Sequence, residues 1–68
     1  HLFKEYMNIS PHQYIISERI TRAKQLLLRQ EMTISEIALA CGFNSQSHLT
    51  CYFRQHIGLT PKAYQMSL

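Results

Sequence analysis

One stretch of the sequence recurs with conservative changes at an offset of 50 residues, so that residues 3–14 match residues 53–64. The two copies share Phe, Pro and Tyr, and they pair Lys with Arg, Glu with Gln, Met with Ile, Ile with Leu and Ser with Thr. Two amphipathic helices with the same capping residues could converge on this pattern. The shared register of so many conservative pairs nevertheless favours a repeated unit of structure.

Each copy predicts the end of one helix and the start of another. Asn8 and Gly58 are residue types that tolerate the left-handed conformation after a last helical turn. Ser10 and Thr60 then supply N-cap hydroxyls, and a proline follows each at the first helical position, where a missing N–H costs nothing. Residues 1–7 therefore look like the tail of a helix, which we expect to begin upstream of this chain.

The segment after the first proline predicts one long helix. Apolar residues recur at helical spacing to about Arg29, with charged residues mostly between them. We expect Tyr14 and Tyr64 to be packing anchors. No segment alternates as a half-buried strand would, so the fold class is expected to be all-α. The recurring positions are Tyr14, Ile16, Ile20, Ala23 and Leu27.

The second half of the chain predicts two helices joined by a tight turn. Thr33 followed three residues later by Glu36 forms a capping box that opens the first of them. Gly42 ends that helix, and Ser45 is a plausible cap for the next, over residues 46–57. A last short helix follows from the second proline.

Small residues lie where these two helices must approach each other. Ala38 leaves room for the following helix, and Gly42 supplies the backbone geometry of the turn. The inward residue after the turn is Leu49 rather than His48, which implies a turn one residue longer than the commonest register. The residues expected to close the core are Ile34, Ile37, Phe43, Leu49 and Phe53.

A helical wheel of residues 46–57 separates two sides. The inward side carries Leu49, Tyr52, Phe53, His56 and Ile57. Gln46 lies at the N-terminal tip, which is nearest the base edges when such a helix enters a major groove, and its amide can pair with adenine. Arg54, further along, is expected to meet phosphate. The outward side carries Ser47, Cys51, Arg54 and Gln55, with Gln46 and Thr50 on the flanks.

The chain resembles the AraC/XylS family of bacterial transcription regulators over essentially its whole length. The most specific stretches are ISEIALACGF at 34–43, SQSHL at 45–49, YFR at 52–54 and GLTPKAY at 58–64. The resemblance implies two helix-turn-helix units that are joined by a long helix and contact adjacent major-groove segments. Residues 1–8 would be the tail of the first recognition helix, residues 10–30 the long linker helix, and residues 33–68 a homeodomain-like helix-turn-helix subdomain with a closing helix.

The resemblance also implies which residues contact the bases. The expected base contacts are Gln46, Ser47, Thr50 and Cys51. A longer, often basic side chain is common in the family at the position of Cys51, so the thiol departs from the pattern. The expected phosphate contacts are Ser45, His48, Arg54, Arg19 and Arg22. For Arg19 and Arg22 on the long helix, the alternative to a phosphate contact is a place on a solvated charged face.

The sequence supports zinc binding and catalysis less well than it supports DNA binding. His48 and Cys51 are three residues apart on one helix, but His56 falls on the inward side and Cys41 belongs to the preceding helix, so the four do not converge. Cys41 is expected to be a small core residue. No carboxylate is placed to orient a catalytic base. We therefore expect no enzymatic activity, no metal, no cofactor and no small-molecule ligand.

The formal charge of +3 and the pI near 9.1 favour a polyanionic partner without demanding one. No apolar run approaches the length of a membrane span, and no signal peptide is visible. Two cysteines without a targeting segment indicate reduced thiols, so we expect a bacterial cytoplasmic location.

The leading hypothesis is sequence-specific binding of double-stranded DNA as part of a bacterial transcription regulator, with residues 46–57 in the major groove. The alternative is a helical protein-interaction module that contacts RNA polymerase or a partner regulator through an exposed apolar face. Salt titration separates the two, because only DNA binding weakens steeply as salt rises.

Overall fold

The computed structural model describes residues 10–68, and within that range the chain forms four helices and no strand. The predicted all-α fold is confirmed, as are the bounds of the long helix and of the helix over residues 46–57. The helix tail expected at residues 1–8 lies outside the described residues. The helices are α2 (Pro11–Arg29), α3 (Ile34–Ala40), α4 (Gln46–Ile57) and α5 (Pro61–Met66).

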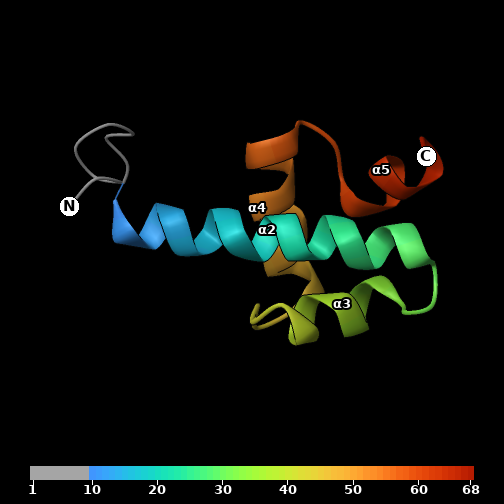
Figure 1. Cartoon of the computed structure of the whole chain (residues 1–68), viewed down its shortest axis with the longest axis horizontal. Helices are drawn as coiled ribbons and strands as arrows, with labels where there is room; N and C mark the ends of the chain where they lie inside the picture. Colours follow the sequence, from blue (N-terminus) through green and yellow to red (C-terminus); the bar gives the residue numbers. More distant parts are fainter. Residues whose placement is uncertain (1–9) are drawn as a thin grey trace.

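The long helix α2 is the element on which the other three pack. In Figure 1, α3 and α5 lie on opposite sides of α2, and α4 crosses it steeply. α4 contacts each of the other three helices. Its orientation is therefore set by the whole fold rather than by one neighbour.

Side-chain hydroxyls cap the start of every helix among residues 10–68. In each case the hydroxyl oxygen accepts a hydrogen bond of 3.1 or 3.2 Å from the backbone N–H three residues later. The predicted capping box is present, because the Thr33 N–H donates to Glu36 Oε1 at 2.8 Å. Gln13 completes a second box, which was not predicted, by accepting from the Ser10 N–H at 3.3 Å. The four caps are Ser10, Thr33, Ser45 and Thr60, as predicted.

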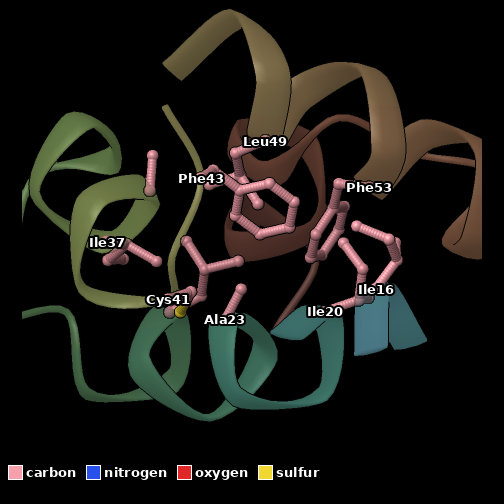
Figure 2. Packing of buried hydrophobic residues seen from close by; sticks show 10 residues of the cluster. Ile16, Ile20, Ala23, Ile37, Cys41, Phe43, Leu49 and Phe53 are labelled. Atoms are coloured by element: carbon pink, nitrogen blue, oxygen red, sulfur yellow. The ribbon is translucent and has the colours of Figure 1, made fainter. Parts of the chain in front are cut away.

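A single apolar core joins α2, α3, the turn and α4 (Figure 2). Alanines at fully buried positions of α2 and α3 let the helix backbones approach closely. Four of the five residues predicted to close the core are buried, whereas Ile34 is only partly buried at its margin. The buried residues of this core are Ile16, Ile20, Ala23, Leu27, Ile37, Ala38, Cys41, Phe43, Leu49 and Phe53.

Two expectations about single side chains are wrong. Tyr14 is 41% exposed and not a packing anchor, because at 100° per residue it lies on the opposite side of α2 from the buried residues Ile16, Ile20, Ala23 and Leu27. Its hydroxyl bonds to Glu18, and that bond, together with the carboxylate charge, raises the pKa of Tyr14. His56 is exposed although the wheel places it inward, since the last turn of α4 projects past α2 (Figure 1).

The short helix α5 closes the domain against α2 and α4. Tyr64 packs edge-on against Phe53, with ring centroids 5.4 Å apart, so its predicted role as a packing anchor is confirmed. Gln65 Nε2 donates to the carbonyl oxygen of Leu27 at 3.0 Å and so satisfies a carbonyl at the end of α2. The chain leaves α2 through Gln30, which has a left-handed φ of 56°.

Candidate nucleic-acid interface

The connection from α3 to α4 is a glycine turn that orients the second helix. Gly42 has a φ of +95°, a conformation that glycine adopts without a steric penalty. The Gly42 N–H donates to Leu39 O at 3.2 Å and the Phe43 N–H to Ala38 O at 2.9 Å. These are the paired bonds of a Schellman motif. They close the last turn of α3 and return the chain to the core, where Phe43 is buried.

Leu49 and Phe53 anchor one side of α4. Both side chains are 0% exposed, and Figure 2 shows them beside Phe43 in the core. His48 is exposed, so the predicted register, with Leu49 inward and His48 outward, is confirmed. The half-buried Tyr52 packs edge-on against His48, with ring centroids 6.1 Å apart. Apolar burial on this side therefore decides which α4 residues point outward.

The outer side of α4 carries a polar surface. Its residues line one open hollow, and they are termed the α4 face: Gln46, Ser47, Thr50, Cys51 and Arg54. Thr50 is half-buried, and the other four are exposed. Amide, hydroxyl, thiol and guanidinium groups are present, and no carboxylate lines the hollow. All four residues predicted to contact bases thus share one surface with Arg54.

The remaining predicted phosphate contacts lie in two places. Ser45 and His48 are at the N-terminus of α4, where Ser45 Oγ accepts from the His48 N–H at 3.2 Å. Arg19 reaches the same region from α2, because it lines a hollow together with His48 and Gly42. Arg22 is exposed in a separate hollow along α2, to which α4 contributes no residue. The structure therefore groups Arg19 with the start of α4 and leaves Arg22 apart.

Sequence reasoning missed the hydrogen bond that Arg19 makes. Its Nη1 donates to the carbonyl oxygen of Gly42 at 3.1 Å, which ties α2 to the turn. The two residues are 23 positions apart, so no local spacing relates them. The only hint in the sequence is that Arg19 adjoins Ile20 and follows Ile16 by one helical turn, which places it at the edge of the buried stripe.

The two cysteines have opposite environments. Cys41 is buried, as predicted, and burial raises the pKa of its thiol against the opposing effect of the Arg22 charge. Cys51 is exposed on the α4 face. Across residues 10–68, no three His, Cys, Asp or Glu side chains are grouped so that they could hold a metal ion. None of the helices in this range combines the length and apolar character needed to cross a membrane.

Comparisons with known proteins agree on one kind of domain. The family described as "Helix-turn-helix domain" matches residues 1–67. The chain is 44% identical over 94% of its length to the probable transcriptional regulator LumQ of Photobacterium leiognathi. It is 43% identical over 88% of its length to the HTH-type transcriptional regulator ExsA of Pseudomonas aeruginosa. It spans only 26% and 22% of those two relatives.

Two solved structures share the fold. An AraC-type transcriptional regulator from Chromobacterium violaceum superposes with a TM-score of 0.90 at 38% identity, over 97% of this chain and 59% of that one. The DNA-binding domain of AdpA, solved in complex with a target DNA, superposes with a TM-score of 0.86 at 32% identity, over 96% of this chain and 59% of that one.

Proposed function

Because the chain belongs to the AraC-type family of helix-turn-helix domains, we propose that it is a sequence-specific DNA-binding part of a bacterial transcription regulator, with α4 in the major groove. The family's place among transcription regulators supports a binding role rather than an enzymatic one. We also infer that the regulator works in the cytoplasm, where bacterial DNA is found.

The observation that carries this proposal is the α4 face. An α-helix with its side chains is about 10–12 Å across, which matches a major groove about 12 Å wide. Leu49 and Phe53 hold the opposite side of α4 in the core, so the α4 face can meet DNA without unfolding anything. The neighbour AdpA was solved with its DNA-binding domain in complex with a target DNA, which supports DNA as the partner of a domain with this fold.

The chemistry of the α4 face suits base reading. Gln46 begins α4, and its amide can make two bonds to adenine N6 and N7. The hydroxyls of Ser47 and Thr50 can donate to or accept from either base type. Cys51 offers a small polarisable thiol for contact with a thymine methyl group. We assign base contacts to these four residues.

Phosphate contacts are assigned around this face. Ser45 and His48 lie at the N-terminus of α4, where backbone N–H groups and the helix dipole favour an anion. Arg54 extends from the third turn of α4, where a guanidinium can reach a phosphate oxygen. Arg22 stays a prediction, because it shares no hollow with α4. The formal charge of +3 favours the same polyanion.

The proposal is tested by duplex selection followed by binding titration. The full chain selects preferred duplexes from a random pool, and the selection is repeated with Gln46→Ala. We expect Gln46→Ala to cost about 1–3 kcal/mol at one preferred base and to relax the preference there. Gln25→Ala is the control, because Gln25 is an exposed glutamine of α2 in a hollow to which α4 contributes no residue. It should leave the preferred base unchanged.

Equal losses on all duplexes after Gln46→Ala would contradict base reading by this residue. Arg54→Ala should weaken binding to every duplex equally and lower the magnitude of the salt slope by about 0.9. Binding that does not weaken with salt would instead favour a protein-interaction module that contacts RNA polymerase or a partner regulator.

A further inference from the structure

The guanidinium of Arg19 lies directly against the turn between α3 and α4. Its Nη1 donates to the Gly42 carbonyl oxygen at 3.1 Å. A Cβ added to Gly42 would lie 3.0 Å from Arg19 Nε and 3.1 Å from Arg19 Cζ. Arg19 thus occupies the space that any side chain at residue 42 would need.

Gly42 therefore meets two separate demands. Its φ of +95° is strained for any residue with a side chain. Its missing Cβ also admits the guanidinium close to the backbone, where a charged donor can bond to a carbonyl just beyond the end of a helix. The bond joins α2 to a turn that α3 and α4 share, so Arg19 links three helices at one point.

This point lies close to the start of α4. Gly42 is separated from Gln46, the first residue of α4, by residues 43–45 alone. The hollow that Arg19 lines also includes Asn44, His48 and Tyr52, which belong to the turn and to the first two turns of α4. Any change in the direction of the turn would therefore shift the N-terminal half of the α4 face.

We propose that Arg19 is a positioning residue for base reading, which holds the turn so that α4 presents Gln46 and Ser47 to the bases. This inference rests on the proposed function and replaces the phosphate contact expected for Arg19 from the sequence. A displacement of about 1 Å is enough to impair a recognition site whose support is loose. The flat guanidinium with its fixed donors suits this task better than the flexible ammonium of lysine.

The DNA test compares the association constants for the selected duplex and for an unrelated duplex of equal length. We expect Arg19→Ala to lower their ratio about fivefold or more, which corresponds to the loss of at least one base contact. The salt slope should stay unchanged, whereas Arg54→Ala should lower its magnitude by about 0.9. Arg29→Ala is the control, because it removes an exposed arginine from the same helix far from the turn. It should leave the ratio unchanged.

Arg19→Lys separates charge from shape. A lysine keeps the positive charge, so a phosphate contact would retain both the ratio and the slope. A positioning role predicts that the ratio falls while the slope is kept. If Arg19→Lys preserves the ratio of association constants, the proposal is overturned. It is also overturned if Arg19→Ala weakens binding to both duplexes equally and lowers the magnitude of the salt slope. Circular dichroism of each variant verifies that the helices are intact.

A second measurement needs no DNA. Gly42→Ala is made in the wild-type chain and in Arg19→Ala, and the urea midpoints are compared as a double-mutant cycle. We expect Gly42→Ala to lower the urea midpoint less in the Arg19→Ala background, because the guanidinium atoms that a Cβ at residue 42 meets are gone. An equal fall of the midpoint in both backgrounds would overturn the contact between Arg19 and residue 42. If Arg19→Ala does not fold, Arg19→Gln replaces it as the background.

The two measurements fail separately. A wild-type chain that does not discriminate between the duplexes overturns the proposed function and, with it, the role of Arg19 in base reading. The double-mutant cycle still decides whether Arg19 holds the turn. Discrimination by the wild-type chain together with an unchanged ratio in Arg19→Ala overturns the inference alone.

Discussion

Replacing Leu49 by alanine tests the register of α4, on which the assignment of the α4 face depends. Leu49 is 0% exposed, and truncating a buried leucine costs about 2–5 kcal/mol through lost burial and the cavity that remains. A chain of 68 residues is expected to have only about 3–10 kcal/mol of total stability. Leu49→Ala should therefore remove a large part of the free energy of unfolding.

The loss is measured by urea denaturation followed by circular dichroism at the helical band. With an m-value of about 1 kcal/mol/M for a domain this small, the midpoint should fall by about 2 M or more. The melting temperature should fall by roughly 8–40 °C, because each kcal/mol is worth about 4–8 °C at this chain length.

His48→Ala is the matched control for this substitution. His48 is the adjacent residue and is exposed, so its truncation should change the stability by no more than about 0.5 kcal/mol. The substitution removes the edge-on contact of the His48 ring with Tyr52. A loss for His48→Ala as large as that for Leu49→Ala would refute the register and, with it, the outward position of the α4 face.

Four further outcomes are expected. Gln30→Gly should raise the free energy of unfolding by about 0.5–1 kcal/mol in urea denaturation, because Gln30 ends α2 with a left-handed φ of 56°. That conformation costs a residue with a Cβ about 1–2 kcal/mol, of which the greater chain entropy of glycine offsets about 0.5–1 kcal/mol. Thr33→Ala should lower it by about 0.5–2 kcal/mol, since the cap of α3 is lost. Cys51 should react rapidly with a thiol reagent and Cys41 slowly, because only Cys51 is exposed. Stability should also fall as the pH rises above about 8.5, since the unfolded chain releases the Cys41 proton at a lower pH than the folded chain.

Each of these outcomes has a contradicting result. Equal reaction rates of the two thiols would contradict the burial of Cys41. A destabilised Gln30→Gly would mean that the end of α2 is not left-handed. Ser35→Ala, at an exposed neighbouring serine, is the control for the cap and should be nearly neutral, so equal losses at both positions would remove the cap argument. A pH dependence that persists in Cys41→Ala would assign the alkaline loss to another group.

The sequence by itself determined where the described helices begin and which side of α4 is apolar. Each cap joins a hydroxyl to a backbone N–H three residues later, so the whole interaction is contained in a short stretch of chain. The inward positions of Leu49 and Phe53 follow from the helical period, which is also local. The same period placed Ser47 and Cys51 outward with Gln46 and Thr50 on the flanks, whereas the expectation that these four residues contact bases came from the family resemblance.

Only the tertiary structure decided what depends on elements distant in the chain. His56 occupies an apolar-side position on α4, yet it is exposed, because burial requires a neighbouring helix and the last turn of α4 extends beyond α2 (Figure 1). Arg19 bonds to Gly42 across 23 positions and Gln65 to Leu27 across 38. Periodicity and capping describe contacts within one helix, whereas these bonds exist only because packing brings two different elements together.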